Sequence, residues 1–406
     1  MFKVESDILK QAVGFVAGIV LKGKDASPVL QNTKITFDSN GLRFETTNTD
    51  ISCLYTVQRS FVDSKSASFS TTVPALKFND ILKKIGNEKI SCKFLRSSDK
   101  EVFVLKTAKS KFLLDCLPSN IYPSSRNLEY SSNFSIKASD LLDAINRVKF
   151  SVCTDEARFY INGILLDMSG KNTLGQDALN IVSTDSHRLS IQSVISNVLK
   201  GEISQIILPR RSIQKVVDIL ALAREEEIFI EINKTKIRFS FGGCSVSSNL
   251  IEGEFPQYQR VIPQNTSSHA IIEKSELQKA VNSVSAIFSG SAYNVVKLKF
   301  VNSTLVVEAS RSNKNLGSDI GIAKYDMSCE SNFAEPFVVS YNFSYLMECL
   351  SAVDSKYCKF NFTEPTKPCL VTPDYSLQAE PQPKESEDKK QTTHSDYKFV
   401  IMPIRV

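Results

Sequence analysis

Apolar and polar residues alternate along this chain with two different periods. Short runs with a period of two, such as residues 34–37, 42–45 and 236–241, predict β-strands, and a turn at residues 39–41 separates the first two. Longer amphipathic stretches, such as the one that begins at Ser6, predict α-helices. Sheets with helices gathered on one face would bury these apolar surfaces, so the pattern predicts the α+β class.

The same succession of elements occurs three times. A short strand leads into a serine, an acidic residue and an amphipathic helix at Ser6-Asp7, Ser139-Asp140 and Ser275-Glu276. These pairs lie 133 and then 136 residues apart. We expect each serine to be the N-cap of its helix and each acidic residue to occupy the first helical position, where it complements the helix dipole.

Other features recur at nearly the same offset. Val73-Pro74 and Leu208-Pro209, 135 residues apart, each precede a second helix, and a third copy of that helix is predicted at residues 344–353. Thr49-Asp50 matches Thr184-Asp185, again 135 residues apart. Each copy therefore contains two helices and about eight strands by pattern. Polar or proline-rich junctions divide the chain into predicted domains at residues 1–128, 129–263 and 264–406.

Length and composition agree with a multidomain globular protein. The 406 residues correspond to about 2.7 domains of ordinary size. Hydrophobic residues make up 42% and charged residues 23%. The longest apolar run, residues 12–21, is too short to span a membrane, and no signal peptide is evident, so a cytoplasmic protein is expected. Residues 377–396 are polar and lack a core-forming pattern, which predicts a disordered hairpin loop.

The chain lacks the motifs of common enzymes. Its nine cysteines are scattered, which predicts reduced thiols in the core. No metal, nucleotide or cofactor motif is present, so neither a metal nor a cofactor is predicted. Of the three histidines, only His187 lies in a structured motif, residues 183–189. A hydrolase site there is disfavoured, because the members of a catalytic triad converge from separate parts of a chain.

Four motifs carry a resemblance to a known family. They are SVCTDEARFYINGIL (151–165), STDSHRL (183–189), LIEGEFPQYQRVIP (250–263) and VIMPIRV (400–406). Together, and in this order, they resemble the bacterial DNA polymerase III β-subunit family, the replicative sliding clamps. The resemblance covers the whole chain. It implies three similar domains, each with two inner helices and outer antiparallel sheets, and a closed ring made by a head-to-tail homodimer.

The resemblance also implies a non-catalytic function. Such a ring encircles duplex DNA, is loaded by an ATP-dependent clamp loader, and tethers the replicative polymerase and other repair or translesion polymerases. Sliding needs only sequence-independent phosphate contacts, so a modest net charge of +5 (49 minus 44) suffices. The cations expected to face DNA are Lys24, Lys77, Lys83, Lys84, Arg147, Lys149, Arg210, Arg211 and Lys215. Cations are fewer in the last domain, where acidic residues such as Glu348 and Asp354 offset them.

A peptide pocket between the second and third domains follows from the same resemblance. Its apolar surfaces would accept leucine or phenylalanine anchors of polymerases and of the loader. The pocket is expected to contain Ile161, Thr184, His187, Arg188, Leu189, Pro256, Arg260, Val261, Tyr345, Val400, Met402, Pro403, Ile404, Arg405 and Val406. Ser186 stands where the family commonly has glycine, and Pro368 where other members have serine.

The dimer contact would pair the first domain of one chain with the third domain of the other. Phe112, Leu114, Ile287 and Phe288 are the residues implied there, with a core role for Leu114 nearly as credible. A different class of function remains open, namely a monomeric repeat scaffold that binds peptides without encircling DNA. The weak basic character of the third domain is what favours that alternative.

Overall fold

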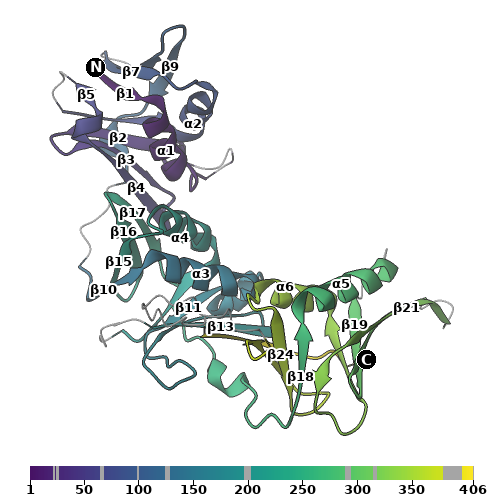
Figure 1. Cartoon of the computed structure of the whole chain (residues 1–406). Coiled ribbons are helices and arrows are strands. Elements are labelled where there is room, and N and C mark those ends of the chain that lie inside the picture. Colours follow the sequence, from purple (N-terminus) through teal and green to yellow (C-terminus); the bar gives the residue numbers. More distant parts are fainter. Residues whose placement is uncertain are drawn as a thin grey trace, which may run out of the picture. The chain divides into compact units, whose positions relative to one another are not determined.

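A computed structural model describes residues 1–21, 23, 27–64, 68–97, 100–123, 129–195, 203–288, 294–313, 318–377 and 396–405 (Figure 1). Lys24, Val406 and residues 378–395 of the expected disordered loop lie outside these ranges. The chain separates into two compact units. Unit 1 comprises Met1–Asp143 and Val198–Glu252, and unit 2 comprises Ala144–Asn197 and Gly253–Val406.

Unit 1 is built from two antiparallel sheets and the helices that cover one of them. The helices are α1 (Ser6–Ala17), α2 (Ala75–Lys84) and α4 (Arg210–Leu222), while α3 (Ala138–Val148) belongs partly to each unit. The strands are β1 (Phe2–Glu5), β2 (Asn32–Asp38), β3 (Gly41–Thr47), β4 (Ile51–Gln58), β5 (Asp63–Ser64), β6 (Phe69–Pro74), β7 (Lys89–Arg96), β8 (Glu101–Lys106), β9 (Lys111–Cys116), β10 (Ser132–Lys137), β14 (Gln205–Pro209), β15 (Glu227–Ile232), β16 (Lys236–Phe241) and β17 (Cys244–Asn249).

The larger sheet of unit 1 joins strands from two of the sequence repeats. Its order is β10-β15-β16-β17-β4-β3-β2-β6, and the smaller sheet has the order β5-β1-β7-β8-β9. The antiparallel pair β4 and β17 makes the join. On this sheet α1 packs against β3 and β4, α2 against β2 and β6, and α4 against β16 and β17. The helices thus cover one continuous sheet, as an α+β fold requires.

Unit 2 repeats this plan with a second join. Its helices are α5 (Lys274–Ser285) and α6 (Phe343–Ala352). Its strands are β11 (Gly163–Asp167), β12 (Leu179–Thr184), β13 (Arg188–Val194), β18 (Ser268–Glu273), β19 (Val295–Val301), β20 (Thr304–Asn313), β21 (Ser318–Ser328), β22 (Glu330–Ser331), β23 (Phe337–Asn342), β24 (Tyr357–Phe362), β25 (Cys369–Asp374) and β26 (Asp396–Ile401). Within unit 2, the strands of one sheet run in the order β11-β12-β13-β26-β25-β24-β18-β22, and those of the other run β21-β20-β19-β23. The pair β13 and β26 makes the join.

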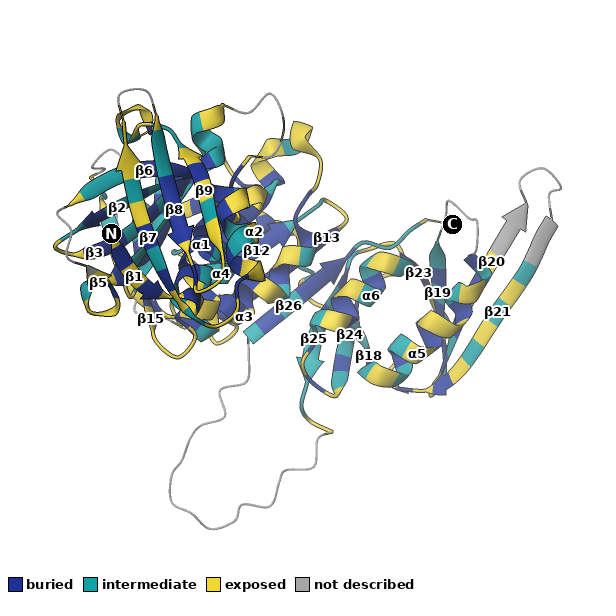
Figure 2. Cartoon of the chain, turned by 90° about the horizontal axis from the view of Figure 1, so that it is seen from above, coloured by how far each residue is buried: buried dark blue, intermediate teal, exposed yellow. Residues whose placement is uncertain are grey.

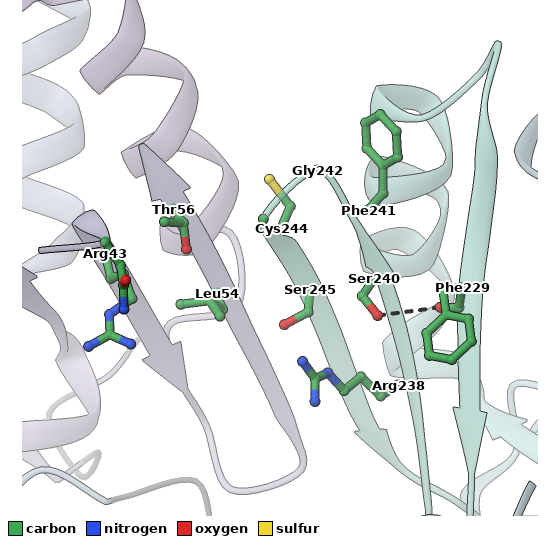
Figure 3. A pocket seen from close by; sticks show the side chains of 12 residues that line it. Arg43, Leu54, Thr56, Phe229, Arg238, Ser240, Phe241, Gly242, Cys244 and Ser245 are labelled. Carbon is green, nitrogen blue, oxygen red and sulfur yellow. Dashed lines mark hydrogen bonds between the residues drawn. The ribbon is translucent and has the colours of Figure 1, made fainter. Parts of the chain in front are cut away.

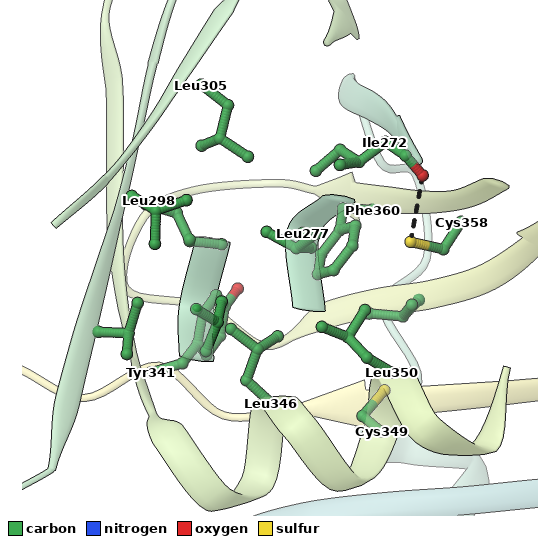
Figure 4. Packing of buried hydrophobic residues seen from close by; sticks show 14 of the residues in the cluster. Ile272, Leu277, Leu298, Leu305, Tyr341, Leu346, Cys349, Leu350, Cys358 and Phe360 are labelled. Carbon is green, nitrogen blue, oxygen red and sulfur yellow. Dashed lines mark hydrogen bonds between the residues drawn. The ribbon is translucent and has the colours of Figure 1, made fainter. Parts of the chain in front are cut away.

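The core of the last repeat lies between α5, α6 and both sheets of unit 2. Leu277 of α5 and Leu346 of α6 are fully buried against Leu298 and Phe360 (Figure 4). Both helices are buried on one side and exposed on the other, which is the amphipathic pattern read from the sequence (Figure 2). The predicted α+β class is therefore confirmed.

The starts of the helices differ from the prediction. Helix α1 begins at Ser6 itself, α3 begins at Ala138 and α5 begins at Lys274, so none of the three serines is an N-cap. The first amide of each helix instead donates to a strand-end carbonyl: Ser6 N to Glu88 O (3.0 Å), Ala138 N to Glu226 O (2.9 Å) and Lys274 N to Lys356 O (2.9 Å). The residue just before a neighbouring strand thus satisfies one of the free amide donors at each helix start.

The cysteines match the expectation of unpaired core thiols. All nine are free, and only Cys116 is not fully buried. Burial raises the pKa of the Cys53 and Cys358 thiols to about 12, so both stay protonated and unreactive near neutral pH. Among the described helices, none combines the length and the apolar character needed to cross a membrane.

Candidate partner-binding pocket and cation sites

The turn between β12 and β13 is held by its own polar side chains. Thr184 Oγ1 donates to the carbonyl oxygen of Arg188 (2.6 Å) and accepts from the amide of Ser186 (3.1 Å). Asp185 Oδ1 accepts from the amides of His187 (2.9 Å) and Arg188 (3.0 Å). These bonds place Ser186 in the left-handed region, with φ of 77°. The turn therefore presents the exposed His187 side chain from a fixed backbone.

Unit 1 contains the same turn between β3 and β4. Thr47 Oγ1 donates to the carbonyl oxygen of Ile51 (3.1 Å) and accepts from the amide of Thr49 (3.2 Å), and Asn48 Oδ1 accepts from the amide of Ile51 (2.8 Å). Thr49 has φ of 78°. Thr47 is thus the structural partner of Thr184, an offset of 137 residues (184 minus 47). The predicted match of Thr49 with Thr184 was wrong by two residues.

Glycine at position 186 is expected to stabilise unit 2. A residue with a Cβ atom in the left-handed region costs about 1 kcal/mol or more, while glycine also adds entropy to the unfolded chain, so Ser186→Gly should gain about 0.5 kcal/mol. Thr49→Gly should gain at least as much, because β-branched residues fit this region worst. Urea denaturation measures both changes. A loss of stability in both variants would show that the hydroxyl groups matter more than the backbone conformation.

Arg188 is the centre of the candidate pocket, and its guanidinium group is buried. Nε donates to Asp185 Oδ2 (3.0 Å), one terminal nitrogen donates to the carbonyl oxygen of Phe150 (2.7 Å), and the other pairs with the Glu348 carboxylate. The guanidinium carbon lies 4.4 Å from the ring centroid of Tyr345 and 5.1 Å from that of Phe150. Arg188 is 9% exposed, so it supports the pocket from within.

The segment after β26 runs beside the turn. Met402 N donates to the carbonyl oxygen of His187 (2.9 Å), and Ile404 N donates to that of Ser340 (2.8 Å). The His187 ring stacks on Tyr345 with centroids 5.8 Å apart and an angle of 23° between the planes. The backbone of the last residues and this ring pair therefore bound one site in unit 2.

The remaining pocket residues fall into two groups. Ile161, Leu189 and Val400 are buried and belong to the core beneath the site. Half-buried or exposed side chains are those of Thr184, Tyr345, Met402, Pro403, Ile404, Arg405, Pro256, Arg260 and Val261. The last three lie on or just before the turn η6 (Tyr258–Val261), and no described hydrogen bond, ion pair or ring contact joins them to the β12–β13 turn. Pro368 is half-buried just before β25.

Sequence reasoning missed the roles of Arg158 and Glu348. Arg158, on the turn η5 (Glu156–Ile161), donates to the carbonyl oxygen of Asp185 (3.1 Å) and to Ser186 Oγ (3.2 Å). Glu348, regarded as an acidic offset to DNA-facing cations, pairs with Arg188 instead. Arg158 lies within the motif at residues 151–165. Its hydrogen-bond partners are about 28 residues away in sequence, so no local pattern of apolar and polar residues indicates them.

Lys215 does not have the position expected for a DNA contact. It is 7% exposed, and its Nζ donates to the carbonyl oxygen of Phe15 (2.9 Å) and to Asp218 Oδ2 (2.6 Å). A Cβ atom at Gly18 would lie 2.6 Å from this Nζ, so glycine makes room for the ammonium group. Lys215 therefore caps the end of α1, where carbonyl groups and the helix dipole favour a cation.

Arg147 has a comparable position in unit 2. It donates to the carbonyl oxygen of Ala352 (2.8 Å) and to Asp354 Oδ2 (2.8 Å), and its guanidinium carbon lies 4.0 Å from the ring centroid of Tyr397. Its side chain is only 12% exposed. The expectation that Arg147 and Lys215 contact phosphate is therefore not supported by their positions, and we assign both to the contacts between repeats.

Replacing Lys215 by methionine separates these two roles. We expect Lys215→Met to lower the free energy of unfolding by about 2 kcal/mol, because it removes charge-assisted hydrogen bonds at a buried site. The salt dependence of DNA binding should not change, since no phosphate contact is lost. Lys83→Met, at an exposed position of α2, is the matched control and should leave stability unaltered. Urea denaturation measures the stability, and DNA-binding titrations at several salt concentrations measure the salt dependence. A smaller salt dependence in Lys215→Met would show that Lys215 does contact DNA phosphate.

The other predicted cations stay on the surface. Lys77, Lys83, Lys84, Lys149, Arg210 and Arg211 are exposed. Arg211 is ion-paired with Asp50 (2.6 Å). Among the predicted dimer residues, Leu114 and Phe288 are buried within the chain, whereas Phe112 and Ile287 are half-buried. Within a single chain, Leu114 is therefore a core residue.

Unit 1 has a separate groove on the face of its larger sheet that points away from the helices. Its volume is about 470 Å³, and Thr56 of β4 and Ser245 of β17 lie between Arg43 of β3 and Arg238 of β16 (Figure 3). Arg43 pairs with Asp38 (2.6 Å) and Arg238 with Glu231 (3.5 Å). None of the predicted site residues lines this groove. Its shape follows from short side chains in the middle of the sheet.

Comparisons with known proteins agree with this architecture. Family models of the DNA polymerase III β subunit match in succession: the N-terminal domain at residues 1–128, the central domain at 135–257 and the C-terminal domain at 259–382. The β sliding clamp of Pseudomonas aeruginosa is 26% identical over 405 residues, with 100% of both chains covered, and that of Rickettsia felis is 28% identical over 410 residues, with 99% of each covered.

Solved structures show the same fold. A Caulobacter crescentus β sliding clamp with bound polyethylene glycol superposes with a TM-score of 0.85 at 25% identity, covering 100% of this chain and 98% of that one. The Bartonella birtlesii sliding clamp bound to griselimycin gives 0.84 at 25% identity, covering 100% of both. The three-domain clamp fold, with antiparallel sheets and about two helices per domain, is thus confirmed. This chain belongs to the DNA polymerase III β-subunit family, the β sliding clamps, which are the non-catalytic processivity factors of DNA polymerase III in DNA replication.

Proposed function

We propose that two copies of this chain close head to tail into a ring that encircles duplex DNA. Each copy contributes three domains, at residues 1–128, 129–263 and 264–406. An ATP-dependent clamp loader places the ring on DNA in the cytoplasm, and the ring then holds the replicative polymerase by a topological link that tolerates sliding. The exposed cations Lys77, Lys83, Lys84, Lys149, Arg210 and Arg211 supply weak phosphate contacts.

The observation that carries this proposal is the repeated junction. β17 and β26 are each the third strand after the second helix of their repeat, and they pair with β4 and β13, each the third strand after a first helix. β9 has the position of β17 in the first repeat, and β21 has that of β4 in the last. Both are the outermost strands of their sheets. A third junction between β9 of one chain and β21 of another would remove both open edges and would form a heterologous interface that can close.

Exposed apolar side chains on the two edge strands support this pairing. Leu113 on β9 is 60% exposed, and Ile322 on β21 is 53% exposed. Leu113→Lys should raise the dimer dissociation constant at least tenfold, because burying a leucine stabilises an interface by about 1.5 kcal/mol or more. Leu174→Lys, at an 80% exposed position in neither strand, is the control and should leave the dimer unchanged. Light scattering after size exclusion at several concentrations measures both.

The candidate pocket of unit 2 is proposed to bind short peptides of its partners. Met402, whose amide donates to the carbonyl oxygen of His187, begins a half-buried segment that continues through Pro403 and Ile404. Together with the His187–Tyr345 ring pair, this segment would receive leucine or phenylalanine anchors. The replicative polymerase catalytic subunit, the clamp loader and repair or translesion polymerases are the proposed partners. The same site would serve each in turn.

The mass of the wild-type protein in solution decides between this function and a monomeric peptide-binding scaffold. The ring requires a mass of two chains at micromolar concentration. A stable monomer would favour the scaffold, because the proposed pairing of β9 with β21 needs a second chain. The acidic residues of the third domain are a weaker argument for the scaffold than the sequence suggested, because Glu348 pairs with Arg188 and Asp354 pairs with Arg147.

A further inference from the structure

Tyr258, Asp167 and Asn180 form a buried polar network in unit 2, and none of the three is among the predicted site residues. Asp167 and Asn180 face each other across the β11–β12 pair, and the Tyr258 hydroxyl reaches both. It donates to Asp167 Oδ2 (2.9 Å) and accepts from Asn180 Nδ2 (3.2 Å). Asp167 Oδ1 also accepts from the amide (3.1 Å) and the hydroxyl (2.7 Å) of Ser169. All three members of the network are at most 5% exposed.

Keeping these groups in the interior is costly for the fold. Asn180 Oδ1 is buried with no hydrogen-bond partner among the described residues. Asn180 can take this position only because residue 170 is glycine: a Cβ atom there would lie 2.5 Å from the Asn180 side-chain amide group. Desolvation raises the pKa of Tyr258, so its hydroxyl keeps its proton and remains a donor to Asp167. A buried group left unsatisfied costs about 1–3 kcal/mol and calls for an explanation.

The position of Tyr258 provides that explanation. It is the first residue of η6, and the same short turn carries the exposed side chains of Arg260 and Val261. One side of η6 borders a cavity of about 270 Å³, lined by Gly170, Asn180, Tyr258, Gln259, Ile262 and Lys398. On that side η6 has little packing support, so the hydrogen bonds of Tyr258 to β11 and β12 are the contacts that fix it there.

We propose that Tyr258 is a positioning residue for the peptide pocket, with Asp167 and Asn180 as its anchors. The network fixes η6, and with it Arg260 and Val261, to β12, the strand that ends in the turn of Thr184 and His187. Two pocket walls from separate parts of the chain thereby keep a constant spacing. A preformed site does not have to order itself when a peptide binds. This inference rests on the proposed peptide-binding function.

Tyr258→Phe tests the proposal, with Tyr122→Phe as its matched control. Tyr122, in unit 1, is a buried tyrosine like Tyr258. Its hydroxyl accepts from the amide of Thr47 (3.0 Å) and donates to the carbonyl oxygen of Asn32 (3.3 Å). Each variant loses two hydrogen bonds, so both should lower the melting temperature to a similar extent. Only Tyr258→Phe should weaken binding of a fluorescein-labelled hexapeptide ending in Leu-Phe, by about fivefold in fluorescence anisotropy.

Two further measurements separate positioning from a general loss of stability. Amide hydrogen exchange should become faster at residues 257–262 in Tyr258→Phe, while residues 184–188 keep their wild-type protection. Gly170→Ala keeps every hydrogen-bonding atom but displaces Asn180, and should weaken the peptide to a similar degree. If wild type binds and Tyr258→Phe binds equally well, the network is only structural and the proposal is wrong. If wild type does not bind, the peptide-binding function itself fails, and the proposal fails with it.

Discussion

Replacing Arg188 by alanine is expected to lower the free energy of unfolding of unit 2 by about 3 kcal/mol. The guanidinium group is the common partner of Asp185, Glu348 and the carbonyl oxygen of Phe150, and it lies against the Tyr345 ring. Its removal takes a donor from each of these acceptors in a site where Arg188 is 9% exposed. This loss of about 3 kcal/mol is at the lower end of the range for breaking a buried ion pair, because the Glu348 side chain is 49% exposed and water can solvate it.

Urea denaturation followed by hydrogen exchange in unit 2 measures this loss. Arg158→Ala is the matched control, since Arg158 donates to the same turn but its side chain is 37% exposed. The control should change stability little. Arg188→Lys should recover only part of the loss, because an ammonium group cannot reproduce the planar fork. Wild-type stability in Arg188→Ala would show that this cluster of charges contributes nothing net to the fold.

Deleting residues 402–406 is expected to abolish binding of polymerase and loader peptides, with affinity falling at least 100-fold. The deletion removes the half-buried Met402, Pro403 and Ile404, together with the backbone bonds to His187 and Ser340. Interface energy is concentrated in a few apolar anchors, so losing one whole wall of the site exceeds any single substitution. Anisotropy with the labelled hexapeptide and with the intact polymerase subunit measures the loss.

The dimer should survive this deletion, because neither proposed edge strand is affected. β9 and β21 lie outside the removed segment, and the β13–β26 pairing ends at Ile401. Light scattering should therefore still give the mass of two chains. If the deletion variant became monomeric or unfolded, the last residues would belong to the core and their assignment to a binding site would be wrong.

Period and repetition were sufficient to predict the class of fold and the order of elements. The second helix of the last repeat, predicted at residues 344–353, is α6 (Phe343–Ala352). Local pattern failed at the helix starts: none of the three serines is an N-cap, and the first helical amide donates to a carbonyl oxygen just before another strand, such as that of Glu88 or Glu226. It also failed by two residues at the Thr184 turn, because spacings between repeats vary with loop length and only the hydrogen bonds reveal the matching positions.

The cations were the least predictable part of the candidate site. Lys215 and Arg147 resemble surface residues of amphipathic helices, yet their acceptors at Phe15 and Ala352 lie about 200 residues away in sequence. Charge alone cannot distinguish a phosphate contact from a helix-end contact, since both attract an ammonium or guanidinium group. The Tyr258 network was equally hidden, because its members are separated by 91 and 78 residues.

Retention on DNA tests the ring most directly. The clamp is loaded on closed circular plasmid with clamp loader and ATP, separated from free protein, and the plasmid is then cut at one site. A ring held by topology stays on the closed circle at salt concentrations that remove ordinary phosphate binders, and it leaves once the DNA has ends. Equal retention on circular and linear DNA would contradict encirclement and would leave affinity for DNA as the better explanation.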